Sequence, residues 1–231
     1  MTQSQPKSKC SHVIECLLGG LAIFACVLGI VGLLILLFAF TQRLPSKQSG
    51  LMQKSRTIVL CLFDYAQDHG GNYPDGKTST EVFQKLIDGG YVSYPHLEDE
   101  TSDQNLFYFP MPGKVKPSSR KLKPENVCWD VTSGLNVLSP PETPVVYMTG
   151  YKIDYAPGSR AVPEKWPAPT WWNWLTASDF PRGYIVVSYM SNNTFFLRAA
   201  SDNSIPNFVP PHLVLSSKNY HQLTPDGQEP Q

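Results

Sequence analysis

The sequence predicts an α+β protein with one N-terminal transmembrane helix, followed by an amphipathic helix packed on an antiparallel β-sheet. Residues 17–40 carry no charged side chain, and apolar residues recur at helical spacing from position 51 to 66. Beyond position 105 the chain changes to short β-type runs separated by proline and glycine. Because the helices precede the strands instead of alternating with them, we expect an antiparallel sheet covered by helix.

The apolar run 17–40 is the first predicted element. A helix rises about 1.5 Å per residue, so this run is long enough for the roughly 30 Å hydrocarbon core of a bilayer. It is also longer than the apolar region of a cleavable signal, which has about 7–15 residues. We therefore expect a tail at 1–12 and an uncleaved anchor at 13–42. Basic residues stand on both sides of the run, so charge alone does not fix its orientation.

Two features of this segment suit contacts between helices. Ala25 and Gly29 have the small-x-x-x-small spacing that lets helices approach closely. Glu15 is the only carboxylate beside the run, where a charge costs free energy unless it reaches the interface or a partner. A lipid-facing anchor that contacts no other helix is also compatible with both features, so both interpretations stay open.

After the anchor, Pro45 and Gly50 predict a break or kink, so residues 43–50 are assigned to a joint. The amphipathic helix that follows should end at Gly70 and Gly71, because glycine commonly terminates helices. Its apolar face must pack on the elements that follow it in the chain.

A second, short helix is predicted from about 79 to 88. Thr78 and Glu81 have the spacing of a capping box, in which each side chain accepts a hydrogen bond from the other residue's backbone N–H. Gly89 and Gly90 supply its end. Its apolar face consists of Val82, Phe83, Leu86 and Ile87.

Six later runs have β-type composition: "LFYF", "NVCWDV", "PVVYM", "YKIDY", "YIVVSYM" and "TFFLRA". The last two should form a hairpin, 184–190 with 194–199, because the asparagines between them tolerate the positive φ of a short connection. The folded domain would cover 51–205. The tail at 206–231 is rich in proline and polar residues, and we expect it to be partly disordered.

Charge and motifs argue against two classes of function. The chain has 19 basic and 19 acidic residues, so it offers no strongly basic surface to nucleic acid. It contains no G-x-S-x-G, H-E-x-x-H, P-loop or G-x-G-x-x-G motif, and we expect neither an enzyme nor a cofactor. Asp64 and Asp68 share one helix face, but they could act as an acid–base pair only if both lined a cleft facing the sheet.

Two loops are candidate binding sites. Glu98, Asp99 and Asp103 could offer oxygen ligands to calcium, but their stretch lacks the D-x-[DN]-x-[DN]-G pattern of a dedicated calcium loop, so we expect no metal. A tryptophan cluster could contact a glycan or a protein, or could simply be buried over the sheet. Its members are Trp166, Trp171, Trp172 and Trp174.

Cys61 and Cys128 are the only cysteines outside the apolar run and its flank. Their spacing fits neither a zinc site nor a C-x-x-C redox pair. One disulfide and two buried thiols are both compatible with the sequence.

Four stretches occur in a familiar order: an "IE" pair at the start of the anchor, the helix "KSRTIVLCLFDYAQDHGGNYPDG", the helix "VFQKLIDGGYV" and the strand pair "GYIVVSYMSNNTFFL". This order resembles the type II secretion pseudopilin-like proteins of planctomycete and verrucomicrobial bacteria. The resemblance covers about 13–200 and is most specific in "DYAQDHGGNYPDG". The chain departs from these proteins at the prepilin cleavage site, because it has Cys10-Ser11 where that site has a Gly-Phe pair.

The resemblance implies a pilin-like fold on a single-pass inner-membrane anchor, with the N-terminus cytoplasmic and the C-terminal domain periplasmic. In an oxidising periplasm, a disulfide between Cys61 and Cys128 becomes the favoured alternative. Glu15 lies where such subunits carry the glutamate that is thought to contact a neighbouring subunit during assembly.

The expected function is therefore that of a membrane-anchored, pseudopilin-like structural or interaction protein of a type II secretion-related system. Its partners would be other pseudopilin-like subunits or envelope proteins. The alternative is a solitary anchored binding module of the cell envelope that holds a glycan or a protein through the loop 166–174. Self-association through the apolar helix separates the two hypotheses, because the binding module needs none.

Overall fold

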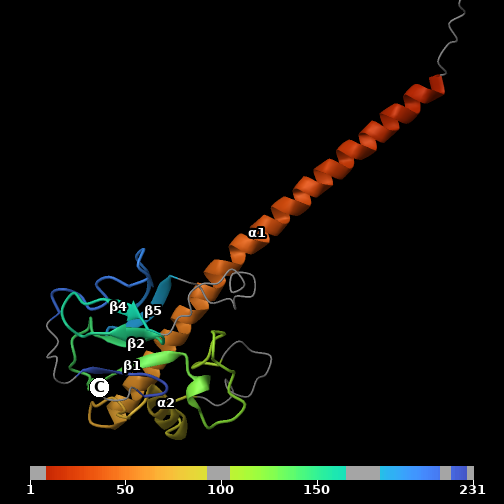
Figure 1. Ribbon diagram of the computed structural model, residues 1–231. Coiled ribbons are helices and arrows are strands. Elements are labelled where there is room, and N and C mark those ends of the chain that lie inside the picture. Colours follow the sequence, from red (N-terminus) through yellow and green to blue (C-terminus); the bar gives the residue numbers. More distant parts are fainter. Residues whose placement is uncertain (1–8, 93–104, 165–182, 214–219, 228–231) are drawn as a thin grey trace, which may run out of the picture. The chain divides into compact units, whose positions relative to one another are not determined.

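The computed structural model describes residues 9–92, 105–164, 183–213 and 220–227, and within the first helix it describes the side chains at 26–35 and 48–68. The chain divides into two compact units, Met1–Gln48 and Ser49–Gln231. Helix α1, Lys9–Asp68, continues through the boundary between them (Figure 1). Helix α2 is Ser79–Asp88, and the short 3-10 helix η1 is Pro124–Asn126.

The prediction of a transmembrane anchor at 13–42 is wrong. Within the described parts of the chain, no helix combines the length and the apolar character that crossing a membrane requires. A span needs about 20 consecutive apolar residues, whereas the described side chains of the apolar run cover only 26–35. The same finding overturns the predicted single-pass inner-membrane localisation, with its cytoplasmic N-terminus and periplasmic domain.

Helix α1 also does not break at the predicted joint, 43–50. Its backbone stays helical through Pro45 and Gly50 and ends at Asp68. Within a helix a proline costs about 3 kcal/mol and a glycine about 1 kcal/mol, so either residue is tolerated where the rest of the helix offsets that cost. The boundary between the two units nevertheless falls after Gln48, inside the predicted joint.

Five strands form one antiparallel sheet in the order β6-β5-β2-β1-β7, and β3 pairs with β4 separately. The strands are β1 Trp129–Ser133, β2 Pro144–Met148, β3 Tyr151–Ile153, β4 Ala161–Pro163, β5 Tyr184–Tyr189, β6 Thr194–Arg198 and β7 His221–Leu223. The predicted last hairpin is confirmed as β5 and β6, with Asn192 at φ 57° in the connection. The run "LFYF" is not a strand, although Phe107 within it is buried.

Helix α2 begins and ends where the sequence predicted. The Thr78 hydroxyl accepts a hydrogen bond from the Glu81 N–H at 3.0 Å. The Glu81 carboxylate accepts one at 2.8 Å from the Lys77 N–H, and not from the Thr78 N–H as predicted. The capping box is therefore present in its first half and displaced by one residue in its second.

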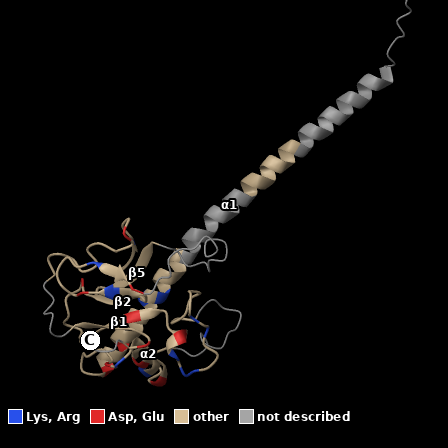
Figure 2. Cartoon of the chain, viewed as in Figure 1, with Lys and Arg blue, Asp and Glu red and all other residues tan. Residues whose placement is uncertain are grey.

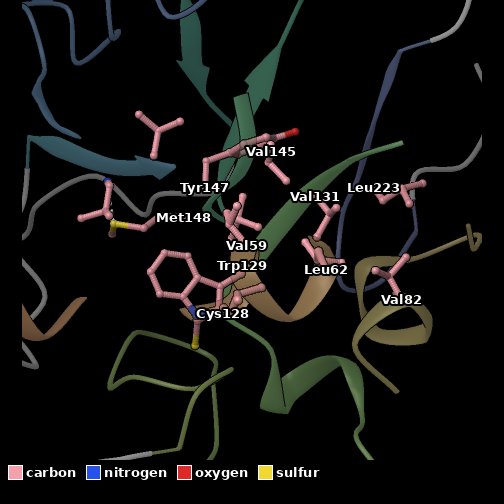
Figure 3. Close-up of a cluster of buried hydrophobic side chains, with 14 of the residues drawn as sticks. Val59, Leu62, Val82, Cys128, Trp129, Val131, Val145, Tyr147, Met148 and Leu223 are labelled. Carbon is pink, nitrogen blue, oxygen red and sulfur yellow. Dashed lines mark hydrogen bonds between the residues drawn. The ribbon is translucent and has the colours of Figure 1, made fainter. Parts of the chain in front are cut away.

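The second half of α1 packs on one face of the sheet. Ile58 and Leu62 are fully buried, and the Ser55 hydroxyl shares a 2.7 Å hydrogen bond with the hydroxyl of Ser188 in β5. Side chains from α1, α2, β1, β2 and β7 meet there in one cluster (Figure 3). Its members on the strands include Trp129, Val131, Met148 and Leu223. The amphipathic helix predicted from position 51 therefore covers the sheet with its apolar side, in an α+β arrangement.

Strand β7 lies in the tail at 206–231 that was expected to be partly disordered, and it pairs with β1. The amide of Gln222 in β7 donates to the buried Asp130 carboxylate at 2.7 Å and to the Tyr151 carbonyl at 2.6 Å. Its carbonyl oxygen accepts from the Ile153 N–H at 3.0 Å. This one side chain therefore links β7 to β1 and to β3.

A buried polar network continues from Gln222 on the face of the sheet opposite α1. The hydroxyls of Tyr147 and Tyr155 lie 2.8 Å apart, and the Tyr155 hydroxyl lies 2.9 Å from that of Thr132. Burial raises the pKa of Tyr147 and of Tyr155 well above the ordinary value near 10. Both phenols therefore stay protonated in the folded protein and keep their hydrogen bonds.

The links made by Gln222 predict a structural role for the C-terminal strand. Replacing Gln222→Leu removes three hydrogen bonds and leaves a buried carboxyl group without its amide donor, so the free energy of unfolding should fall by about 3 kcal/mol. Urea unfolding of the full chain measures this. The matched control is His221→Leu at the exposed neighbouring position, which should change stability by less than about 0.5 kcal/mol. Equal effects of the two substitutions would contradict the assignment.

The buried tyrosines predict alkaline sensitivity. When folding raises the pKa of a group, the unfolded chain releases that proton at a lower pH than the folded protein does. The contribution of these groups to the free energy of unfolding is therefore complete below about pH 9, and it is lost as the pH rises through the pKa values of the folded state. Burial raises the pKa of Tyr189 to about 12 and that of Cys61 to about 11, which places the loss between about pH 9 and pH 12. Urea unfolding at a series of pH values should show this decline. It should be shallower in the Tyr147→Phe variant, and equal slopes would argue against the network as its cause.

Candidate interaction surfaces

Helix α1 exposes a continuous apolar stretch at 26–35, here called the apolar segment, and no charged residue interrupts it (Figure 2). Its large side chains are 45% to 64% exposed. They are Val27, Leu28, Ile30, Val31, Leu33, Leu34 and Ile35. At about 100° per residue, these positions cover roughly 220° of the helix circumference. A helix surface that is apolar over such a wide arc is normally covered by other apolar groups.

Gly29 and Gly32 occupy the remaining side of the apolar segment. A Cβ built on either glycine would meet no atom within 4 Å. The glycine side of the helix is therefore open to the close approach of another backbone. The side chains of Ala25 and Glu15 lie outside the described residues, so their predicted roles in helix contacts stay predictions.

The two acids of α1 do not line a cleft. Asp64 and Asp68 are exposed, and Asp68 accepts a 2.8 Å hydrogen bond from the Tyr91 hydroxyl. Beside them, the rings of Tyr65 and His69 stack with centroids 3.8 Å apart, and Tyr91 meets Tyr65 edge-on. The geometry required for an acid–base pair facing the sheet is therefore not present.

A cleft of about 360 Å³ opens where β1, the β2–β3 connection and the residues after β7 come together. Buried Asp130 lines it, and the exposed acids Glu125 and Glu164 belong to the same lining. Sequence reasoning missed this cleft because its lining comes from segments that are far apart in the chain. Among the described residues, no three histidine, cysteine or acidic side chains are placed to hold a metal ion. The calcium candidates Glu98, Asp99 and Asp103 lie outside the described residues.

The two edges of the main sheet differ in their surroundings. At the β7 edge, the Ser79 N–H of α2 donates to the Thr224 carbonyl at 3.0 Å, and the Thr80 hydroxyl donates to the Pro225 carbonyl at 2.9 Å. Helix α2 therefore covers the chain that leaves this edge. At the other edge, β6 pairs with β5 alone among the described strands, and Phe195 is 50% exposed.

Cys61 and Cys128 are separate, buried thiols. Of the two alternatives that the residues left open, the structure has the buried thiols and not the disulfide that the pseudopilin resemblance favoured. The Cys128 thiol donates to the Phe109 carbonyl at 3.2 Å. Burial raises the pKa of Cys61 to about 11 and that of Cys128 to about 12, so neither forms an appreciable thiolate near neutral pH.

The tryptophan cluster at 166–174 lies outside the described residues, so its role as a binding platform stays a prediction. Comparison of the chain with protein-family models, with curated proteins and with solved structures gave no match.

Burial of the two thiols predicts a simple pattern of reactivity. In the native protein near pH 8, a thiol reagent should modify exposed Cys26 and spare Cys61 and Cys128, because the thiolate is the reactive form. In denaturant without reductant, all five cysteines should react. The variants Cys61→Ala and Cys128→Ala should each lose one thiol in denaturant and none in the native state. A count of three thiols in denaturant, which is five minus two, would instead reveal a disulfide.

Proposed function

We propose that this chain is a structural subunit, a pilin-like protein of a type II secretion-related assembly, which binds other subunits through the apolar segment. The exposure of that segment is the observation that carries the proposal. Each Å² of apolar surface removed from water contributes about 25 cal/mol, so a helix with large aliphatic side chains about half exposed gains free energy by packing on a similar helix.

The order of elements supports the same proposal. One long helix is the first described element, its C-terminal part packs on an antiparallel sheet, and the hairpin β5–β6 follows late in the chain. This is the order on which the resemblance to pseudopilins was based. Gly29 and Gly32 add a side on which a neighbouring helix could approach closely. By resemblance, Glu15 would contact the N-terminus of that neighbour.

The alternative, a solitary module that binds a glycan or a protein through the loop 166–174, has no described residue in its favour. It also gives the apolar segment no partner. The two proposals differ in one measurable property, because only the subunit must associate with copies of itself.

Charge introduced into the apolar segment should prevent association. The substitutions Leu28→Lys and Leu33→Lys lie on different sides of the exposed arc, and a lysine buried in a helix contact is strongly unfavourable. Sedimentation velocity should show oligomers of the native chain and a dissociation constant for the double variant raised at least about tenfold. The matched control places Gln53→Lys and Leu60→Lys on exposed positions of the same helix in the other unit, and it should associate like the native chain.

Oxidative cross-linking locates the contact. In a chain with Cys10→Ser and Cys16→Ser, exposed Cys26 at the edge of the apolar segment should form a disulfide-linked dimer under mild oxidation. Adding Cys26→Ser should abolish that dimer, because the other two cysteines are buried. A native chain that stays monomeric at all accessible concentrations would contradict the proposed function.

A further inference from the structure

Strand β6 pairs with β5 alone among the described strands, so one set of its backbone groups points away from β5. The Ala199 N–H donates to the Gly183 carbonyl at 2.7 Å, which fixes the residues of this hairpin that bond to β5. In an antiparallel pair, hydrogen-bonded and non-bonded residues alternate, and the non-bonded residues direct their N–H and C=O outward. On β6 these outward residues are Thr194, Phe196 and Arg198.

The side chains along this edge are largely apolar and are not shielded in the usual ways. Phe195 is 50% exposed, while Phe196 and Leu197 are half-buried. Edge strands commonly carry a proline, a lysine or a bulge that prevents pairing with another chain. Strand β6 has no proline, lysine or bulge, its register with β5 is regular, and its one charged residue, Arg198, is the last of the strand. The β7 edge, in contrast, has only three residues.

We propose that β6 is a dimerisation edge, which pairs antiparallel with β6 of a second copy of this chain about a two-fold axis at Phe196. In this register, Phe196 lies opposite Phe196 of the second copy, and Phe195 lies opposite Leu197. Thr194 lies opposite Arg198. Each of the three outward pairs then exchanges two main-chain hydrogen bonds, and the two sheets become one.

The register centred on Phe196 is the one that pairs all five residues of β6 with the second copy. Aromatic and aliphatic residues face each other across the strands, which stabilises antiparallel pairs. The two Arg198 side chains lie four residues apart along the ladder, about 14 Å at 3.4 Å per residue, which exceeds the Debye length of about 10 Å. A register centred on Arg198 would place two like charges opposite each other, and any shift leaves fewer of the five residues paired.

The pairing is expected to be weak in isolation. A five-residue ladder buries less than the roughly 1,200 Å² of stable complexes, so the dimer should form only at high protein concentration or where copies are already held close together. The proposal does not depend on the proposed function, because the pairing uses only residues of β6.

Cysteine cross-linking tests the register. In the full chain with Cys10→Ser, Cys16→Ser and Cys26→Ser, the variants Phe195→Cys and Leu197→Cys are made separately with tags of different size. The paired positions lie about 4.5 Å apart between Cα atoms, within disulfide range. Mild oxidation of the mixture should give at least about tenfold more cross-linked dimer of mixed size than of either single size.

Two further variants keep the test independent of small losses of stability. Phe196→Cys alone should form a symmetric disulfide, because its paired Cα atoms lie about 5.5 Å apart. Adding Phe195→Lys, at a half-exposed position, should suppress that disulfide without unfolding the chain, as circular dichroism will show. Absence of both cross-links, or equal yields in the mixed and single reactions, would overturn the proposal.

The same cross-links made in the Leu28→Lys and Leu33→Lys background separate the two proposals. The pairing of β6 should persist there at matched high concentration, whether or not the apolar segment drives association. Loss of the cross-links in that background alone would show that the edge pairing depends on the apolar segment, and would overturn the independent dimerisation edge.

Discussion

The packing of the second half of α1 against the sheet is the contact on which the rest of the folded unit depends. Ile58 and Leu62 are fully buried there, and the Ser55 hydroxyl shares a hydrogen bond with Ser188 of strand β5. Burial of such side chains contributes about 1.5–3 kcal/mol each, which stabilises helical backbone that an isolated peptide would hold only weakly. The contrast within α1 then has a physical meaning. Most of the apolar side chains between Leu51 and Ala66 are buried against the sheet, whereas those of the apolar segment are exposed.

The opposite face of the sheet is held by a different kind of interaction. Tyr147, Tyr155 and Gln222 are buried polar groups, and each forms the hydrogen bonds that its position allows. Breaking such bonds costs more than replacing apolar contacts of similar size, because a buried group without a partner has lost water and gained nothing. The network therefore specifies which strands are neighbours, whereas the apolar packing of α1 on the other face mainly stabilises the folded state.

The elements that the sequence predicted well are those governed by local chemistry. Helix α2 follows from the Thr78 cap and a four-residue apolar face, and the β5–β6 hairpin follows from alternating β-type residues around Asn192. Strands β4 and β7 have only three residues each, so their own composition carried no signal. They form because strands distant in the sequence offer them partners. Strand β4 pairs with β3, and β7 pairs with β1 and bonds to β3 through Gln222. The buried run around Phe107 failed as a strand prediction for the converse reason, because apolar composition alone does not supply a pairing partner.

The errors in the first helix have the same origin. The apolar run 17–40 was interpreted as a span, and Pro45 with Gly50 as a joint, from local composition alone. The helix continues through Pro45 and Gly50 although both residues are unfavourable within a helix. The candidate surfaces were only partly predictable: the apolar segment is visible as composition, but the open edge of β6 and the cleft beside Asp130 exist only after the strands are ordered.

The two proposed contacts would limit assembly in different ways. Pairing of β6 about a two-fold axis is isologous, so it uses up its own surface and stops at two copies. The apolar segment is exposed over roughly 220° of its circumference, which is wide enough to contact more than one neighbouring helix. Such a contact does not by itself limit the assembly to a fixed number of copies. If both contacts form, the strand edge fixes a pair and the helix joins pairs into a larger array. A chain that used the edge alone would remain a dimer, so the size of the assembly itself reports which contact dominates.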